Sequence, residues 1–410
     1  MRILHTADWH LGDHLGRIDR TDDLRKAVER VAAHCKEEKV DVLLVAGDLF
    51  SELSRPDSLR ETIRHWQEVF RQFLQDGGTI LTLTGNHDNE SFCQTLVHAM
   101  TLAAPTVGRM GETIPLGRLY LAADPTFLRL RDRAGGYDVQ FVLMPYPTAS
   151  RYIKGEGGLK YGSPEEKNNL LIAAWADTLR DIRAHPSYDP KAPAVLGAHV
   201  HLHGSSVGPS LFRITNEEDI VVQGAELPNQ FDYIALGHIH KPQFLGASHV
   251  RYSGSIERMD LGEQGDRKGV VLVEIGEDGR NEEPVVLEMP STPIYEVSVL
   301  DPATDIPRLM QEYPGAANDL VNLHIKYTAG SDQLEEVLRD LDRIFPRWYA
   351  RDWQESGTLG QPIGGSENVS KSFADTVRDY LGQELIQHDE NERAEILSIV
   401  DELLKDEEGE

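Results

Sequence analysis

The sequence has little cysteine and no long apolar run. Only two of its 410 residues are cysteines, Cys35 and Cys93, and they lie far apart and outside any CxxC spacing. This excludes a disulfide framework or a zinc ribbon. No apolar stretch approaches the roughly 20 residues of a membrane span, and the chain reaches Asp8 after too few apolar residues for a signal peptide. We therefore expect a soluble cytoplasmic protein that does not bind membranes.

Positive charge is also scarce. The chain has 41 Lys and Arg residues against 68 Asp and Glu residues, which gives a formal net charge of -27. This excess argues against a protein that coats nucleic acid or a membrane surface through basic residues, although it is compatible with a local cationic groove. The excess is steepest in residues 291–410, which carry 26 acidic and 10 basic residues. We expect that part of the chain to present a different kind of surface.

Short apolar runs alternate with amphipathic segments in the first half of the chain. Runs rich in Val, Ile and Leu predict strands at residues 3–6, 40–46, 79–83, 139–144, 194–198 and 233–236. The helical spacing of apolar residues predicts helices at 21–35, 59–73 and 163–175, the last with a capping box that begins at Ser163. This alternation predicts a layered α/β fold whose sheets are covered by helices.

The composition divides the chain into four segments. Residues 1–290 form the α/β domain, and residues 291–348 form a small α/β cap module with two predicted strands and a predicted helix. Residues 349–367 are a linker, because Gly, Ser and Pro accumulate toward their end. Residues 368–410 contain two short amphipathic helices and an acidic tail. Such short helices are marginally stable alone, so we expect them to dock on another surface.

Metal-binding residue types follow five of the predicted strands. In chain order these residues are Asp8 and His10, Asp48, Asn86, His199, and His238 and His240. Loops at the carboxyl ends of strands converge on one edge of an α/β sheet, so we expect these side chains to meet there. Carboxylate, imidazole and amide ligands without thiolate favour manganese, iron or zinc in a catalytic site over a structural zinc centre.

Seven ligands are too many for one ion and suit two divalent cations that share a carboxylate. Asp48, alone in its motif, is the expected bridge. Two cations about 3.5–4 Å apart hold a phosphate and activate a water molecule for phosphoester hydrolysis. His87 follows Asn86 and is expected at the rim as a general acid, with Asp88 orienting its ring. Each motif alone is a common accident, so the prediction depends on finding all of them in this order.

The same residues resemble the signature of the calcineurin-like metallophosphoesterases, which runs DxH, GD, GNH[DE], H and GHxH. The whole set is present. Within that superfamily, HTADWHLG at 5–12, GNHD at 85–88 and DYIALGHIHKPQ at 232–243 look like the SbcD-type nuclease subunits. The close similarity spans roughly residues 1–260, whereas residues 291–410 match only in layout. The resemblance implies a two-sheet sandwich flanked by helices that binds two manganese ions.

The resemblance also implies roles for individual residues and a partner. One ion would be held by Asp8, His10, Asp48 and His240, the other by Asp48, Asn86, His199 and His238, with His87 as the catalytic histidine. The implied activity is a DNA nuclease of repair and recombination, an exonuclease on duplex ends and an endonuclease on single strands or hairpins. Its implied partner is an SbcC-like coiled-coil ATPase. The chain has no GxxxxGK[ST] loop of its own, so ATP dependence would come from that partner.

Several assignments have alternatives. His201 and His203 compete with His199 as the ligand, although His199 comes first after its strand. Ser51 stands where some relatives have a histidine, a difference that could alter the balance of exonuclease and endonuclease action. The helix at 59–73 is a candidate for a homodimer contact, and the terminal helices are candidates for binding the ATPase. Three basic residues in loops beside the predicted ligands are candidates for contacting DNA phosphates: Arg17, Arg55 and Lys241.

Two other functions are compatible with parts of the sequence. A small-molecule or cyclic-nucleotide phosphodiesterase of the same superfamily would use the same chemistry, and the negative net charge favours it because DNA is an anion. Such an enzyme would not need the cap module or the terminal helices. A non-catalytic scaffold for DNA and the ATPase would need neither the ligands nor His87. We therefore expect the nuclease.

Overall fold

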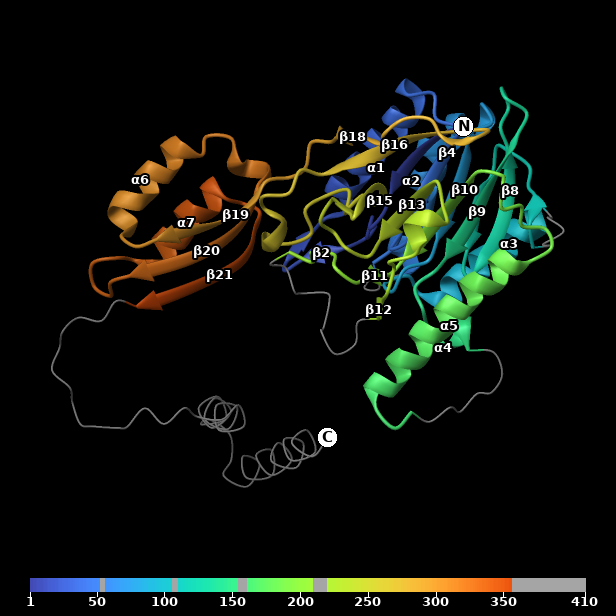
Figure 1. The fold of residues 1–410 in the computed structure, drawn as a ribbon. Helices are drawn as coiled ribbons and strands as arrows, with labels where there is room; N and C mark the ends of the chain where they lie inside the picture. The colour runs from blue at the N-terminus through green and yellow to red at the C-terminus, as the bar shows by residue number, and fades with distance from the viewer. Residues whose placement is uncertain (52–55, 105–109, 154–160, 209–219, 356–410) are drawn as a thin grey trace. The chain divides into compact units, whose positions relative to one another are not determined.

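Two seven-stranded sheets form the centre of the protein. The computed structural model, shown in Figure 1, describes residues 1–51, 56–104, 110–153, 161–208 and 220–355. The first sheet has the order β17-β16-β1-β4-β5-β7, with β18 also paired to β16. Its strands are β1 (Arg2–Thr6), β4 (Val42–Ala46), β5 (Thr79–Leu83), β7 (Leu119–Ala122), β16 (Gly269–Gly276), β17 (Gly279–Arg280) and β18 (Val285–Glu288).

The second sheet has the order β14-β15-β13-β10-β9-β8-β6. Its strands are β6 (Glu112–Thr113), β8 (Thr126–Arg131), β9 (Asp138–Met144), β10 (Ala194–His199), β13 (Tyr233–Gly237), β14 (Gln243–Leu245) and β15 (Ala247–Tyr252). Apolar side chains of both sheets pack between them in one core, which includes Leu44, Leu83 and Phe141. The two-sheet sandwich predicted from the sequence is therefore confirmed.

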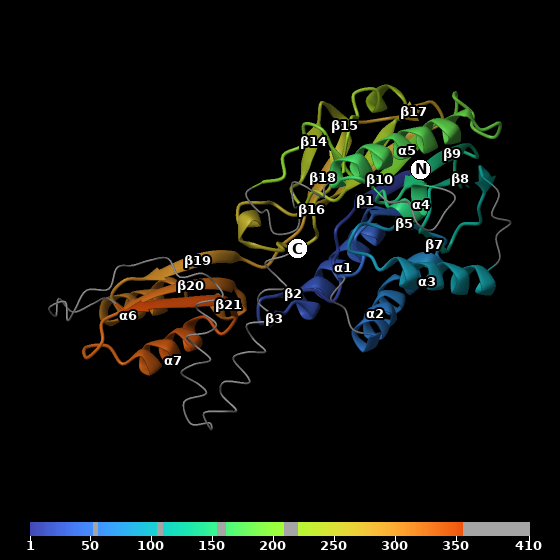
Figure 2. The same ribbon diagram turned by 90° about the horizontal axis from the view of Figure 1, so that it is seen from below.

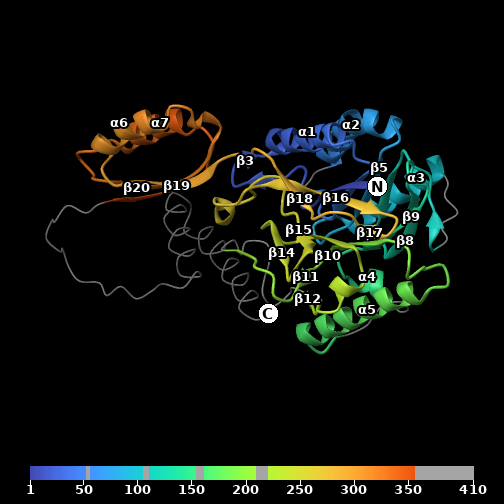
Figure 3. The same cartoon turned by 45° about the horizontal axis from the view of Figure 1, so that its top comes forward.

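Helices cover the outer face of each sheet. On the first sheet these are α1 (Thr21–Glu37), α2 (Pro56–Gln75) and α3 (Glu90–Ala103), and on the second α4 (Ala149–Tyr152) and α5 (Pro164–Ala184). Figures 2 and 3 show the two groups on opposite sides of the sandwich. Because the central strands are covered on both faces, β4 and β5 are buried at every residue, and β4 has an uninterrupted apolar sequence. The predicted cap of α5 is present, with the Ser163 hydroxyl accepting from the Glu166 N–H at 3.1 Å.

Parallel pairing directs the ends of the central strands to one edge. In the first sheet β1, β4 and β5 run parallel, and in the second β9, β10 and β13 do so.

The remaining short elements are β2 (His14–Leu15), β3 (Ile18–Asp19), β11 (His201–Leu202), β12 (Val221–Val222), η1 (Leu227–Asn229) and η2 (Leu261–Glu263). Within the described residues no helix is both long enough and apolar enough to span a membrane.

The predicted cap module forms a sheet and core of its own. Its elements are β19 (Ile294–Val299), α6 (Pro302–Glu312), η3 (Ala316–Asn318), β20 (Leu320–Tyr327), α7 (Leu334–Ile344) and β21 (Trp348–Glu355). Strand β21 corrects the linker boundary, because residues 350–355 pair with β20. The sequence did not reveal it, since an edge strand with little burial shows no regular apolar alternation. The remaining predicted linker residues and the terminal helices lie outside the described residues.

Candidate metal centre

The predicted ligands gather at one edge of the sandwich. Those from the first sheet follow β1, β4 and β5, and those from the second lie at the end of β10 and after β13. Because these strands run parallel within their sheets, their carboxyl ends lie together. The structure thus brings together all seven residues: Asp8, His10, Asp48, Asn86, His199, His238 and His240.

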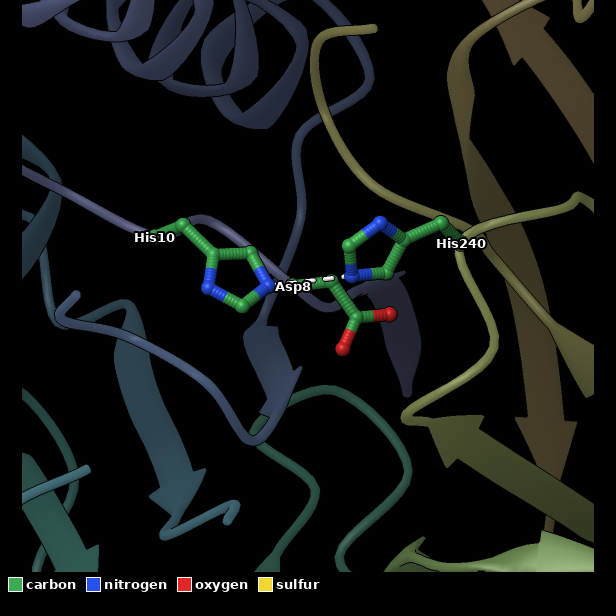
Figure 4. A group of neighbouring side chains, drawn as sticks. All are labelled: Asp8, His10 and His240. Carbon is green, nitrogen blue, oxygen red and sulfur yellow. Dashed lines mark hydrogen bonds between the residues drawn. The ribbon is translucent and has the colours of Figure 1, made fainter. Parts of the chain in front are cut away.

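The first group of side chains consists of Asp8, His10 and His240, whose possible ligand atoms lie within 4.8 Å of one another. The His10 and His240 rings point toward each other in Figure 4, with their Nε2 atoms 3.0 Å apart. Two donor atoms about 2.1 Å from one cation and at right angles lie about 3 Å apart, so this spacing suits a shared ion. The buried Asp8 Oδ2 accepts no hydrogen bond from the described residues. A cation would satisfy this otherwise costly oxygen.

The second group converges on the Asn86 side chain. Asn86 Oδ1 lies 3.0 Å from His199 Nε2 and 2.9 Å from His238 Nδ1. The other ring nitrogen of His199, Nδ1, donates to the backbone carbonyl of Ala46 at 2.7 Å, which leaves Nε2 as the atom that can bind a metal. His201 lies outside this set, with its ring centre 6.4 Å from that of His238. These contacts support His199 as the ligand.

Asp48 lies between the two groups. Its Oδ2 is 3.6 Å from His10 Nε2 and 3.3 Å from His199 Nε2, while its Oδ1 accepts from the His87 N–H at 2.9 Å. One carboxylate oxygen therefore faces an imidazole of each group, and the other fixes the loop after β5. Asp8 is also close enough to join Asp48 and His199 around an ion. The arrangement can hold cations on both sides of Asp48.

The backbone is strained at the ligands themselves. In the described residues, five non-glycine residues have positive φ, and four of them are predicted ligands: Asp8 at 53°, His10 at 45°, Asp48 at 51° and His238 at 94°. Left-handed backbone at a non-glycine residue costs on the order of 1–3 kcal/mol and concentrates at functional sites. The surrounding sheets must therefore hold these loops in place against their local preference.

Two glycines allow the loops to pack this closely. A Cβ atom on Gly47, whose φ is 92°, would collide with the His199 ring, and one on Gly85 would collide with the Asp48 carboxylate. Neither neighbour can move without displacing a ligand. The glycines in the GD and GNHD motifs are thus required by the approach of one loop to another.

The site concentrates negative charge in a buried setting. Burial raises the pKa of Asp8. Burial acts in the same direction on Asp48, but His199 and His10 outweigh it and hold the pKa of Asp48 well below the usual range. Against the effect of burial, the carboxylates of Asp48 and Asp8 raise the pKa of His199 to about 9. A proton on His199 thus neutralises part of the negative charge of the two carboxylates, which divalent cations can neutralise instead. The carboxylate, imidazole and amide donors fit such ions.

His87 lies beside the first group. Its ring is partly exposed, and the ring centre is 5.1 Å from that of His10. Its backbone N–H is bound to Asp48, so the position of the ring is tied to the metal-binding loops. This is the rim position expected of a general acid.

The predicted role of Asp88 is wrong. Instead of holding the His87 ring, its Oδ1 accepts from the Phe50 N–H at 2.9 Å, and its Oδ2 accepts from the N–H groups of Leu49 at 3.2 Å and Gly85 at 2.8 Å. Asp88 therefore fastens the loop after β4 to the loop after β5. Burial and the neighbouring Asp48 raise its pKa to about 6, although three backbone bonds oppose them. No local pattern indicated that backbone groups would surround this carboxylate.

Two residues at the site were not predicted. Tyr146 follows β9, and its ring centre lies 5.4 Å from that of His238 and 6.2 Å from that of His199. Its place after a central strand was a usable signal, but tyrosine was not among the ligand types considered. Glu263 contacts His240 from a distant turn, with its Oε1 2.8 Å from His240 Nδ1. Burial raises the pKa of Glu263, but Lys268 and His240 outweigh this and lower it to about 2.

The predicted DNA-contacting residues lie in different settings. The Arg17 guanidinium stacks on the Trp348 ring, 3.9 Å from its centre, and donates to the carbonyls of Trp348 at 2.9 Å and Pro346 at 2.7 Å. It therefore joins the loop after His10 to the cap module. Lys241 directly follows the predicted ligand His240, whereas Arg55 lies outside the described residues. The Ser51 hydroxyl is buried and donates to Asp13 at 3.1 Å.

Comparisons with known proteins agree with this geometry. A family model described as calcineurin-like phosphoesterase matches residues 1–242. The SbcD subunit of the SbcCD nuclease from Rhodobacter capsulatus is 30% identical over 284 residues, which cover 67% of this chain and 66% of that protein. The SbcD protein of Bacillus subtilis is 27% identical over the same shares, and that of Escherichia coli is 29% identical over 84% of this chain and 80% of that protein. The match thus spans just under two thirds of the first two relatives.

Proposed function

Because the chain belongs to the calcineurin-like phosphoesterase family, we propose that it is a metal-dependent DNA nuclease that hydrolyses phosphodiester bonds. The observation that carries the proposal is the position of Asp48, with one oxygen facing an imidazole of each ligand group. The substrate is suggested by the relatives, which are named as SbcD subunits of the SbcCD nuclease. The activity expected is exonuclease action on duplex ends and endonuclease action on single strands or hairpins.

The two groups are proposed to hold two divalent cations, most readily manganese. Asp8, His10 and His240 would bind one, Asn86, His199 and His238 the other, and Asp48 both. A mixed set of carboxylate, imidazole and amide donors suits manganese. When bound, the cations would neutralise the phosphate and activate water for in-line attack.

The remaining steps belong to the side chains. His87 is proposed to donate a proton to the oxygen that leaves phosphorus as the P–O bond breaks, so that this oxygen departs as a hydroxyl group. Its tie to Asp48 keeps the ring beside the ligands. Asp88 holds the two loops that carry Asp48 and Asn86 in register. Tyr146 packs beside His238 and His199 and restricts their movement.

DNA and an SbcC-like coiled-coil ATPase are the proposed partners, and the cytoplasm is the proposed location. Lys241 and Arg55 stay candidates for contacting phosphates, whereas the contacts of Arg17 favour a role in holding the cap module. Residues 368–410 are the candidate segment for the ATPase.

We further propose a homodimer. The aromatic residues Trp66 and Phe70 of α2 are buried in the chain's own core and are unsuited to that contact. Leu59 and Ile63 of the same helix are only partly buried and stay the candidates for it.

A cleavage assay tests the proposed substrate. The full chain with manganese is incubated with an end-labelled linear duplex, a hairpin, and the small ester bis-p-nitrophenyl phosphate, each with and without a chelator. Manganese-dependent loss of the labelled end supports the nuclease. Cleavage of the small ester alone, also after addition of an SbcC-like partner, would instead favour the small-molecule phosphodiesterase that the net charge of -27 suggests.

A further inference from the structure

A buried carboxylate that lies far from the metal-binding motifs in sequence contacts one of the ligands. Glu263 ends the short η2 turn and is only 3% exposed. Its Oε1 lies 2.8 Å from His240 Nδ1. Because an ionised carboxylate only accepts hydrogen bonds, Nδ1 must carry the proton and donate it to Glu263. The lone pair of His240 is then on Nε2, the atom that faces His10.

The second oxygen of Glu263 is held from three sides. Glu263 Oε2 accepts from the Ser255 hydroxyl at 3.0 Å and the Met259 N–H at 3.2 Å, and pairs with Lys268 Nζ at 2.6 Å. Lys268 is itself buried at 1% exposure, and its Nζ also donates to the backbone carbonyl of His240 at 2.9 Å. The lysine thus neutralises the carboxylate and binds the backbone of the same ligand. Glu263 cannot rotate away without breaking all of these contacts.

His199 offers a contrast within the same site. Its Nδ1 donates to a neutral backbone carbonyl, that of Ala46, whereas His240 Nδ1 donates to a charged side chain. A carboxylate behind a histidine fixes its tautomer and raises its basicity as a ligand more than a carbonyl does. These two imidazoles therefore differ in how strongly they are supported.

We propose that Glu263 is a positioning residue that holds His240 in the orientation and tautomer needed to bind a cation, with Lys268 as its fixed counter-charge. The inference rests on the proposed function only in requiring that His240 binds a metal. It does not depend on DNA being the substrate. Substituting such a partner of a ligand typically lowers metal affinity about 10–100-fold.

The test measures manganese binding to the full chain by electron paramagnetic resonance of the free ion, with Glu263→Gln as the variant. The amide keeps the shape of the side chain but removes its charge. Glu257→Gln is the matched control, because Glu257 is an equally buried carboxylate whose side chain binds Arg20, Arg30 and the Thr292 N–H instead of a ligand. We expect Glu263→Gln to weaken one of two manganese sites about 10-fold or more, and Glu257→Gln to weaken neither.

A second variant guards against misfolding. Glu263→Gln leaves the buried Lys268 with the Asp266 carboxylate, 3.4 Å away, as its remaining charged partner. Because weakening a buried ion pair is costly, Glu263→Gln is also combined with Lys268→Met, which removes the buried lysine charge. This pair is expected to fold, as judged by thermal unfolding of the metal-free chain, and still to lose affinity at one site. The long-range ¹⁵N–¹H spectrum of the histidines should also show the His240 tautomer fixed in the native chain and mixed in the folded variant.

The outcomes separate this inference from the proposed function. Native manganese affinity at both sites in the folded Glu263 variants would overturn the inference, whatever the substrate. Selective loss of one site in these variants, together with a native chain that cleaves no DNA, would sustain the inference and defeat the nuclease proposal. A native chain that binds no divalent cation would overturn both.

Discussion

Replacing Asp88 by Asn should loosen both metal-binding loops at once. In the native structure three backbone N–H groups, those of Leu49, Phe50 and Gly85, share the two carboxylate oxygens of Asp88. An asparagine offers one acceptor oxygen and turns an NH₂ group toward the others. At least one buried N–H group then loses its acceptor, at about 1–3 kcal/mol, and the remaining bonds lose their charge. We expect the free energy of unfolding to fall by about 3 kcal/mol.

The assay is urea unfolding of the metal-free chain, followed by manganese titration of the same variant. Both are run near pH 8, because burial and Asp48 raise the pKa of Asp88 to about 6 and the carboxyl group must be ionised. Manganese affinity should fall at both sites, since Asp48 and Asn86 lie on the two loops that Asp88 joins. Asn89→Ala is the control. Asn89 caps α3, because its Oδ1 accepts from the Phe92 N–H. Its loss should lower the free energy of unfolding by about 1 kcal/mol without changing manganese affinity.

A different outcome would support the role that the sequence alone suggested for Asp88. If it oriented the His87 ring, Asp88→Asn would lower the turnover rate and leave stability and manganese affinity unchanged. A change in unfolding free energy below about 0.5 kcal/mol, with native metal affinity, would therefore refute the reasoning.

Two further predictions follow from the site. The folded-state pKa of His199, about 9, lies above its ordinary value of 6.5, so its proton should stabilise the metal-free chain by about 3 kcal/mol below pH 6.5, an effect lost as the pH rises through 9. Urea unfolding of the native chain and of His199→Gln at several pH values checks this. The same dependence of unfolding free energy on pH in both chains would contradict it. Gly85→Ala would place a Cβ atom against the Asp48 carboxylate and should abolish manganese binding and DNA cleavage, whereas Gly315→Ala, where a Cβ would meet nothing within 4 Å, should preserve both. Native manganese affinity in Gly85→Ala would show that the loops can adjust.

The central strands and the ligands were predictable because both leave local signals in the sequence. Strands buried on both faces are continuous apolar runs, as at Val42–Ala46, and parallel strands place their ends at one edge. The prediction that Asp8, His10 and His240 meet required no more than this. The resemblance to a known family then limited the order and the chemistry of the ligands.

The rest depended on contacts that no local pattern encodes. Strand β21 is an edge strand with little burial and shows no regular apolar alternation, so all of its residues after Trp348 were assigned to a linker. Asp88 stands beside His87 in sequence, yet backbone N–H groups from another loop surround its carboxylate. Glu263 reaches His240 across 23 residues of chain, and nothing in its surrounding sequence marks it as a partner of a ligand. The left-handed backbone at the ligands likewise arises from the packing of loops against one another.

The most direct test measures bound manganese and cleavage of an end-labelled duplex in the same samples of native chain, Asp48→Asn and His87→Ala. The account predicts two bound ions and cleavage in the native chain. Asp48→Asn should lose both the bound ions and the cleavage, whereas His87→Ala should keep two ions and cleave about 10²–10⁴-fold more slowly. Manganese-dependent cleavage at the native rate in either variant would contradict it.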